Sequence, residues 1–326
     1  MYTQSSVCTQ ITDQQPTKAV TRIAPSPTGA LHLGNARTFM INWAIARKNS
    51  WDILLRIEDL DTPRIKPGMI DQTIDTLHWL GIDWDKGPII QSDDLPNHHA
   101  AMNTLASERL IYPCSLTRSQ IESAASAPNE GDHETRFDPS LRPADIPDQF
   151  NDAGTNWRLI VEKGKLNFTD TFLHEQSIDP SESVGDFVVW TRRNCPSYQL
   201  AVVVDDQHQG VTHIVRGDDL LDSTARQIVL QRALGIPYTP QYTHLPLVRG
   251  QDGRRLAKRH GDTRIDHYRN QGVTHERIIG LLGFWCGVCD TRTEMSTRDF
   301  LAGFDLDTLP RNDIIFTPED DQWLTS

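Results

Sequence analysis

The first third of the chain alternates short apolar runs with stretches of helical periodicity. The run VTRIA at 20–24 predicts a strand, and the Pro/Gly-rich segment PSPTGALHLG after it predicts a loop. From Asn35 onward apolar residues recur at helical spacing, and the run ILLRI at 53–57 predicts a second strand that is covered on both faces. Strand, loop, helix and strand in this order indicate a βαβ unit, so the predicted fold class is α/β.

The predicted secondary structure changes twice in the middle of the chain. Helical spacing predicts helices at about 69–81 and 97–110. Residues 119–155 are rich in Ser, Ala, Pro, Asp and Glu without a sustained period, which predicts a surface insertion. The runs WRLIV, DFVVW and LAVVV, all between residues 157 and 215, then predict several short strands. We therefore expect a subdomain inserted between two halves of an α/β core.

The core is predicted to resume with a strand at 211–215. A helix capped near Asp222 or Ser223 follows, and the Asp-Gly pair at 252–253 predicts a turn between two short runs. A further helix is expected with Thr274 as its N-cap. The expected organisation is a flexible tail at 1–18, a first core half at 19–110, an inserted subdomain at 111–210, a second core half at 211–265 and a helical C-terminal extension at 266–326.

Composition narrows the class of protein. Of the 326 residues, 37% are hydrophobic and 23% are charged, which is typical of a soluble globular protein. No apolar run reaches the ~20 residues of a membrane span, and the polar first 19 residues lack the apolar segment of a secretory signal. We therefore expect a cytoplasmic protein without membrane contact.

The cysteines and the net charge argue against two further classes of protein. Five cysteines without regular spacing argue against a disulfide framework, and the CxxC formed by Cys286 and Cys289 lies in an apolar stretch, where buried thiols are expected. The net charge of −12 argues against a general nucleic-acid-binding protein. Lys and Arg nevertheless concentrate at 249–264, which predicts either a local RNA-binding patch or a solvated charged hairpin.

The segment RIAPSPTGALHLGN contains the first candidate site. It joins the predicted first strand to a helix, where the ligands of open α/β sheets bind and where free backbone N–H groups attract anions. His32 and Asn35 are three residues apart, so both can face a phosphate at the first turn, and Gly34 allows close approach of a ligand. The alternative interpretation is a proline-rich turn with a helix-capping Asn.

The segment RLAKRHG contains the second candidate. Lys258, on a loop after the Asp-Gly turn, could follow the negative charge that builds on a departing pyrophosphate. The alternative is a lysine on an ordinary surface loop.

Together the two segments resemble the HIGH and KMSKS signatures of class I aminoacyl-tRNA synthetases. RIAPSPTGALHLGNAR, LLRIEDLDTPR, SYQLAVVVDD, HIVRGDDLLDSTARQ and LAKRHG resemble the glutamyl branch, over about residues 20–290. The resemblance implies a Rossmann-like parallel sheet and activation of L-glutamate with ATP and Mg²⁺. His32 and Lys258 would be the catalytic residues, and both would bind ATP with Gly34 and Asn35. Ala257 replaces a serine that is common in the branch.

The resemblance also implies a glutamate pocket. Two carboxylates and an ammonium group require cations and an anion, and the matching positions are Arg22, Arg216 and Glu58. Tyr198 would add a hydroxyl contact, and Ala24 and Ser26 would line the pocket through the RIAPS loop. The alternatives are structural ion pairs of either arginine with Glu58 or Asp218, and a core role for Tyr198.

The length resembles that of glutamyl-queuosine tRNA(Asp) synthetases, the truncated relatives of glutamyl-tRNA synthetases. Only 65 or so residues follow LAKRHG, too few for a helical anticodon-binding domain. The resemblance implies transfer of glutamate to the queuosine of tRNA(Asp) by a monomer. The family often has a zinc site that begins with CxC, but here Leu116 stands two residues after Cys114, so no zinc and no other metal site is expected.

Two other functions remain open at this stage. A short glutamyl-tRNA synthetase would charge a tRNA 3′ end, and KRHG after the signature lysine is more typical of full-length enzymes. A non-catalytic protein that binds glutamate or tRNA would have no need for Lys258.

Overall fold

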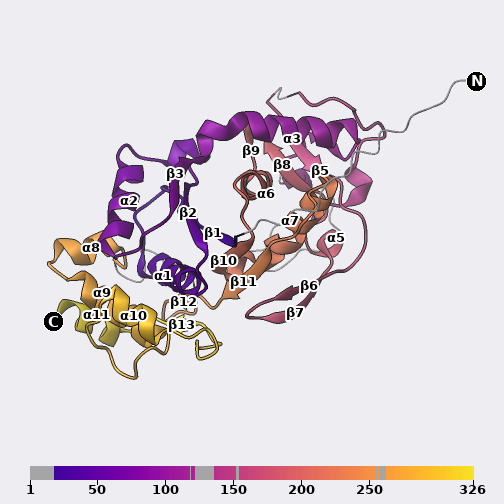
Figure 1. Ribbon diagram of the computed structural model, residues 1–326. Coiled ribbons are helices and arrows are strands. Elements are labelled where there is room, and N and C mark those ends of the chain that lie inside the picture. The colour runs from indigo at the N-terminus through magenta and orange to yellow at the C-terminus, as the bar shows by residue number, and fades with distance from the viewer. Residues whose placement is uncertain (1–17, 118, 122–135, 152–153, 255, 257–261) are drawn as a thin grey trace, which may run out of the picture.

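The computed structural model describes residues 18–117, 119–121, 136–151, 154–254, 256 and 262–326. Its centre is a seven-stranded sheet in which every neighbouring pair is parallel except the last, an antiparallel hairpin (Figure 1). In spatial order the strands are β3 (Lys86–Ile90), β2 (Asp52–Ile57), β1 (Val20–Ile23), β10 (His213–Gly217), β11 (Gln241–Leu245), β6 (Leu166–Asp170) and β7 (His174–Ile178). The predicted α/β class and parallel sheet are confirmed.

Helices cover this sheet because its strands are apolar on both faces. Ile23, Ile53, Leu55 and Ile57 are fully buried and pack in one cluster with helix α1 (Leu33–Lys48). Burying such side chains stabilises the fold by about 1.5–3 kcal/mol each, so these strands anchor the loops at their ends. The other helices of the core are α2 (Met69–Trp79), α3 (Leu95–Ser107), α6 (Tyr198–His208) and α7 (Leu221–Ala233).

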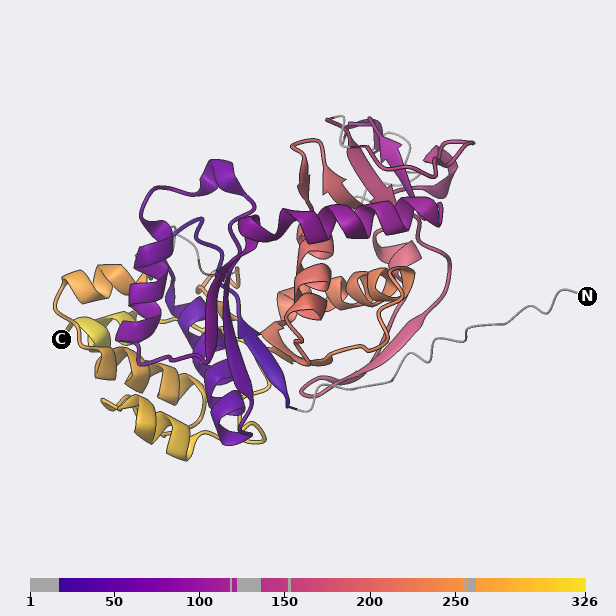
Figure 2. The ribbon, with the colours of Figure 1, turned by 45° about the horizontal axis from the view of Figure 1, so that its top comes forward.

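A second, antiparallel sheet stands beside the first. Its strands, in spatial order, are β4 (Ile111–Cys114), β5 (Asn156–Leu159), β8 (Phe187–Thr191) and β9 (Cys195–Pro196), and the short helix α5 (Pro180–Ser183) precedes β8. Trp157, Phe187 and Trp190 are buried between this sheet and the helices α3 and α6. Figure 2 shows α3 running beneath the second sheet toward the first one.

Strands β6 and β7 come from the segment 111–210 that was expected to form one inserted subdomain. They pair with the edge of the main sheet, since Tyr242 of β11 lies opposite Asp170 of β6. The four-stranded sheet contains the rest of the strands from that segment. The expected domain boundaries remain a prediction, and the expected tail lies almost wholly outside the described residues.

Two local predictions were wrong. The run LAVVV is helical and belongs to α6, where Val202, Val203 and Val204 are all buried. A helix that is covered on nearly every side has the same continuous apolar sequence as a buried strand, so periodicity could not separate them. Neither Asp222 nor Ser223 caps α7, whose N-cap is Leu220 without a side-chain hydrogen bond.

The C-terminal part packs against the first half of the core. Its helices are α8 (Ile265–Asn270), α9 (His275–Trp285), α10 (Thr297–Gly303) and α11 (Pro318–Thr325). Thr274 caps α9 as predicted, because its side chain accepts a hydrogen bond from the backbone N–H of Arg277. The part is not wholly helical, since β13 (Ile314–Ile315) pairs in parallel with β12 (Val248–Arg249), directly after the main sheet.

Two cysteines and the apolar helices complete this region. Cys286 is buried in the main core cluster as expected, and burial raises the pKa of its thiol. Cys289 is only partly buried, so the expectation of two buried thiols holds for Cys286 alone. Across the described residues, we find no helix that combines the length and the apolar character needed to span a membrane.

The packing of α9 predicts an unequal response to two identical substitutions. A Cβ added at Gly280 would lie 2.0 Å from the carbonyl oxygen of Thr293, so backbone must move. Gly280→Ala is expected to lower the free energy of unfolding by about 1–3 kcal/mol, measured by urea denaturation.

Gly283→Ala, in the same helix, is the matched control. There the added Cβ meets only the end of the Met295 side chain at 3.1 Å, which can rotate away. The expected change is smaller than about 1 kcal/mol, because alanine also favours the helix. Equal losses in the two variants would contradict the proposed role of the Thr293 contact.

Candidate active site

A cavity of about 550 Å³ opens at the carboxyl ends of β1 and β10. From β1 the chain continues to β2 on one side, and from β10 it continues to β11 on the other, so the cavity lies at the topological switch point of the sheet. Nine of the predicted site residues line it: Arg22, Ala24, Ser26, His32, Gly34, Asn35, Glu58, Tyr198 and Arg216. Residues from 22 to 216 in the sequence thus meet in one hollow.

The N-terminus of α1 forms one end of the cavity. His32 is the N-cap, and its Nδ1 accepts hydrogen bonds from the backbone N–H groups of Gly34 at 3.1 Å and Asn35 at 3.3 Å. The side chain of Asn35 in turn accepts from the backbone N–H of His32 at 3.4 Å. The two residues therefore form a reciprocal capping box, and the helix begins at Leu33 rather than at Asn35.

Lys258 lies outside the described residues. The chain on either side of 257–261 is nevertheless held at the α1 end of the cavity. Val248, at the start of β12, lines the cavity, and Arg264 forms an antiparallel bridge with His32. The backbone N–H of Leu33 also donates to the carbonyl of Thr263 at 2.9 Å.

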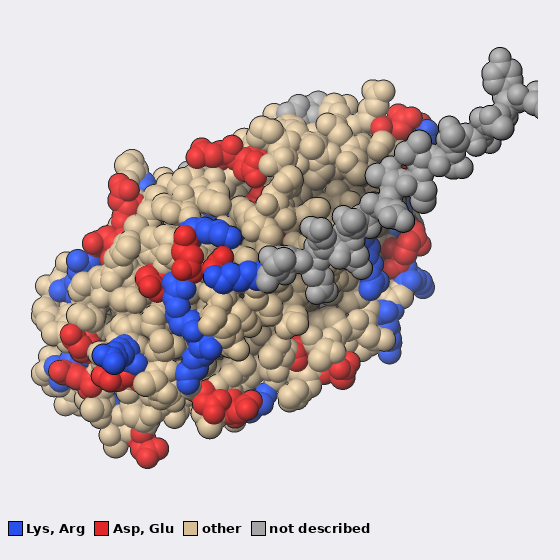
Figure 3. Space-filling view, viewed as in Figure 1, with Lys and Arg blue, Asp and Glu red and all other residues tan. Residues whose placement is uncertain are grey.

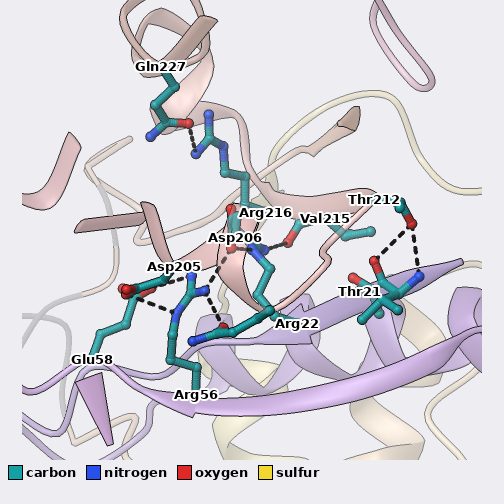
Figure 4. A network of polar contacts seen from close by, with 12 residues as sticks. Thr21, Arg22, Arg56, Glu58, Asp205, Asp206, Thr212, Val215, Arg216 and Gln227 are labelled. Carbon is teal, nitrogen blue, oxygen red and sulfur yellow. Dashed lines mark hydrogen bonds and ion pairs between the residues drawn. The ribbon is translucent and has the colours of Figure 1, made fainter. Parts of the chain in front are cut away.

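A buried arginine organises the opposite wall (Figure 4). Arg56 of β2 is fully buried, and its Nη1 lies 2.7 Å from Oδ1 of Asp206 while its Nη2 lies 3.1 Å from Oε1 of Glu58. Asp205 is 4.0 Å from Nε. Although burial alone would lower the pKa of Arg56, the three carboxylates raise it above its usual value. Arg56 therefore stays charged and fixes Glu58 at the edge of the cavity.

Glu58 is less acidic than an ordinary glutamate. Burial raises its pKa, and the positive charges of Arg56 and Arg22 limit the rise. A carboxylate held by one cation at its back can still bind an ammonium group on its cavity side.

Arg22 reaches the cavity from β1. Its Nε lies 3.5 Å from Oδ1 of Asp206, and its Nη1 donates to the backbone carbonyl of Val215 at 3.4 Å (Figure 4). The suspected ion pair of Arg22 or Arg216 with Glu58 is not the one observed, because Arg56 is the partner of Glu58.

Arg216 reaches the cavity from β10, the neighbouring strand. Its guanidinium donates to Nε2 of His244, to Oε1 of Gln227, to Oγ1 of Thr224 and to the carbonyl of Leu220, at 2.7–3.2 Å. All of these acceptors are neutral. No carboxylate in the described part of the chain pairs with Arg216, including Asp218, which had been considered as its partner.

Tyr198 lies at the N-terminus of α6, and 40% of the residue is exposed. It therefore lines the cavity instead of joining the core. Ser197 caps the helix, and Tyr198, the next residue, lines the cavity together with Glu58 and Arg216.

Asp218, next to Arg216, titrates in the neutral range. Burial and the nearby carboxylates of Asp313 and Asp219 raise its pKa to about 6. Asp219, which contributes to this rise, lines the cavity.

A second hollow of about 620 Å³ adjoins the first and shares Ser26, Thr28, Glu58 and Tyr198 with it. Three arginines, Arg64, Arg193 and Arg226, are among its lining residues. Glu58 and Asp61 line the hollow as well, and Asp61 pairs with Arg64 and Arg193. The shared residues connect this hollow directly with the cavity that contains Arg22 and Arg216.

The surroundings of Cys114 are apolar. Cys114 is buried with Tyr112, Ile121 and Phe137, and Leu116 packs against the same cluster. Among the described residues, no group of three or more His, Cys, Asp or Glu side chains could hold a metal ion. The absence of zinc stays an expectation.

Acidic and basic side chains are interspersed on the face shown in Figure 3. The basic segment 249–264 is only partly described, and within it Arg249 pairs with Asp313 and Arg264 pairs with Asp262. These described arginines thus have their own carboxylates.

Sequence reasoning missed the residues that hold the site from behind. Arg56 had a signal, since it is a charged residue inside the apolar run ILLRI, and Asp205 and Asp206 follow a run of three valines. Thr224 and Gln227 lie within the motif HIVRGDDLLDSTARQ but had no role assigned to them. His244 had no signal, because a single polar residue in a strand is usually a surface residue.

A parallel sheet with a cavity at its switch point, a His-capped helix at one end and buried arginines at the other define the catalytic domain of a class I aminoacyl-tRNA synthetase. Residues 18–311 match the family described as tRNA synthetases class I (E and Q), catalytic domain, and the chain belongs to this family.

Individual relatives agree with this assignment. A protein of Rhodopirellula baltica named glutamyl-Q tRNA(Asp) synthetase is 45% identical over 86% of this chain and 89% of its own length. A glutamate–tRNA ligase of Pelobacter propionicus is 34% identical over 94% of this chain but only 65% of its own length. The crystal structure of a glutamate tRNA ligase from Elizabethkingia meningosepticum has the same fold, with a TM-score of 0.76 at 24% identity, over 94% of this chain and 68% of that one.

The Arg56 network predicts a large loss of stability on truncation of its cation. In Arg56→Met three buried carboxylates would lose the cation that they share, and the free energy of unfolding is expected to fall by about 3–5 kcal/mol in urea denaturation at pH 7.

Arg47→Met is the control for the chemical change. Arg47 pairs with Asp83 and Asp85, which are 69% and 39% exposed, so this loss should be about 1 kcal/mol or less. A loss at Arg56 no larger than that at Arg47 would show that the buried charges are not coupled as described.

Proposed function

We propose that this chain activates L-glutamate with ATP and transfers the glutamyl group to the queuosine of tRNA(Asp). The observation that carries the proposal is one cavity with two arginines and a glutamate at one end and the N-terminus of α1 at the other. The named relative that matches along most of both chains supports the choice of acceptor.

The cavity has the charges that an acidic amino acid requires. Arg216, a buried cation without a carboxylate partner in the described chain, would bind a carboxylate of glutamate, and Arg22 and Tyr198 would bind beside it. Glu58 would hold the ammonium group, because Arg56 fixes its position and the positive charge of Arg56 opposes the rise in the pKa of Glu58 that burial causes. Ala24 and Ser26 would shape the pocket.

ATP would occupy the α1 end. Phosphates bind at helix N-termini, and here the first turn is fixed by His32 and Asn35, with Gly34 between them. A Cβ at Gly34 would lie 3.0 Å from the imidazole of His32, so a larger residue there would press on the ring that caps the helix. Mg²⁺ would enter with the nucleotide and bridge its phosphates.

The reaction then needs position and charge rather than a general base. A carboxylate oxygen of glutamate attacks the α-phosphorus of ATP, the bond to the β-phosphate oxygen breaks, and pyrophosphate leaves with its electron pair. Lys258 and His32 would stabilise the growing negative charge. A hydroxyl of the acceptor then attacks the carbonyl carbon of the adenylate, and AMP leaves.

The second hollow offers space for the acceptor. It opens onto Glu58 and Tyr198 and brings three arginines next to the glutamate site, which suits a phosphate-bearing strand. We propose that the protein acts as a monomer. Because tRNA and ATP are the substrates, we place the protein in the cytoplasm.

Two assays test the proposal in order. Glutamate-dependent exchange of pyrophosphate into ATP is expected without any tRNA, and its absence would favour a binding protein without catalytic activity. Radioactive glutamate should then label queuosine-containing tRNA(Asp) at a periodate-sensitive diol and should not label tRNA(Asp) that lacks queuosine. Label at the 3′ end of tRNA(Glu) alone would instead identify a short glutamyl-tRNA synthetase.

Lys258→Ala is expected to slow pyrophosphate exchange by ~10²-fold or more, the scale of losing one preorganised charge contact. Lys165→Ala, which removes an exposed lysine outside the cavity lining, should keep the wild-type rate. A wild-type rate in Lys258→Ala would remove that lysine from the mechanism.

A further inference from the structure

A buried chain of three side chains crosses three neighbouring strands behind the cavity. Asp170 ends β6, His244 lies in β11, and Arg216 lies directly opposite His244 in β10. Oδ2 of Asp170 is 2.7 Å from Nδ1 of His244, and Nε of Arg216 is 3.0 Å from Nε2 of His244. Asp170 and His244 are fully buried.

The hydrogen-bond donors fix the protonation of this chain. Arginine N–H groups only donate, so Nε2 of His244 must be the unprotonated acceptor. The proton of a neutral imidazole is then on Nδ1, where it faces Asp170. Burial lowers the pKa of His244, although the hydrogen bond to Asp170 opposes the shift. His244 is thus a neutral imidazole that donates a hydrogen bond to the carboxylate of Asp170 and accepts one from the guanidinium of Arg216.

The same contacts determine how many N–H groups of Arg216 remain available to a ligand. A guanidinium has five N–H groups, and four are engaged by His244, Gln227, Thr224 and the carbonyl of Leu220. The remaining N–H is on Nη1. Since Arg216 lines the cavity, the direction of this single donor depends on how firmly the other four are held.

We propose that Asp170 and His244 are positioning residues that aim Arg216 at a carboxylate of the substrate. The proposal rests on the proposed function and deepens it. A direct carboxylate partner would neutralise Arg216 and compete with the substrate. The neutral imidazole orients the guanidinium and keeps its charge available, and the negative charge of Asp170 acts from one residue further away. Because the charge of Arg216 is not neutralised by a direct partner, the pair thereby favours a charged carboxylate over the isosteric but uncharged amide of glutamine.

The backbone explains why Asp170 is in place before any ligand binds. Its Oδ1 accepts from the backbone N–H groups of Phe172 at 3.0 Å and Leu173 at 2.8 Å, in the turn between β6 and β7. The backbone N–H of His244 donates to the same carboxylate. The edge hairpin thus supplies a fixed anion to the centre of the sheet.

Steady-state pyrophosphate exchange tests the proposal. His244→Phe removes the acceptor but keeps a buried ring, and the KM for glutamate is expected to rise about 10-fold or more, the scale of one hydrogen bond to a charged group. The kcat and the KM for ATP should change much less. The preference for glutamate over glutamine, measured as the ratio of kcat/KM values, should fall.

His244→Gln provides partial rescue. Its Oε1 can accept from Arg216 even though the link to Asp170 is lost, so the rise in KM should be smaller than in His244→Phe. Thr243→Val is the control: it changes the adjacent residue of β11, whose side chain points to the other face of the sheet, and should leave all constants unchanged. Equal effects of Phe and Gln, or equal rises in the KM for both substrates, would overturn the positioning role.

The protonation state can be measured without any activity. In the folded wild-type protein, ¹⁵N shifts of the histidine that is missing from the spectrum of His244→Gln should report a neutral ring protonated on Nδ1 at pH 7. An Nε2–H tautomer or an imidazolium would contradict the proposed hydrogen bond from Arg216 to Nε2 of His244. Loss of exchange activity in the wild type with the expected tautomer intact would refute the proposed function alone.

Discussion

The structure depends on a cation buried among three carboxylates. Arg56 of β2 contacts Glu58 after the same strand and both Asp205 and Asp206 of α6, so it links the first core half to a helix about 150 residues later. Buried charges are costly unless they are paired and hydrogen-bonded. The pairing is therefore a strong constraint on where α6 can sit, and α6 in turn brings Tyr198 to the cavity. Arg22 and Arg56 both contact Asp206, and Arg56 also contacts Glu58, so the position of Arg22 is coupled to that of Glu58.

The two arginines of the cavity are held in different ways. Arg22 lies close to a carboxylate at 3.5 Å, whereas Arg216 is surrounded by neutral acceptors and reaches a carboxylate only through His244. The arginines and carboxylates at this end of the cavity are equal in number, so Arg216 is the cation that lacks a direct carboxylate partner in the described chain. A carboxylate ligand would therefore be attracted to Arg216 itself.

Much of this could be read from the sequence, and the limits have physical causes. The β1–α1–β2 unit was predictable because its strands are apolar and its loop has turn residues, and the nine described site residues were found because they lie in recognisable motifs at strand and helix ends. LAVVV was assigned to a strand although it is helical, because a helix that is buried on all sides shows no periodic pattern of polar residues. Asp170 and His244 escaped notice because their pairing depends on the order β10–β11–β6, which no local pattern contains. The capping role of His32 was hidden since Ser, Thr, Asp and Asn are the usual caps.

The pairing of β12 with β13 has a consequence for how such chains can be divided. Two residues near the C-terminal end supply the backbone partners for the strand that leads into the Lys258 segment, and Asp313 accepts a hydrogen bond from the N–H of Leu247 at 2.8 Å, next to the cavity wall. The segment around β13 is thus built into the domain that contains the cavity. A module boundary placed after α8 would cut through a shared sheet, so recombination or fusion in this family is expected to conserve the 305–316 segment as part of the catalytic unit.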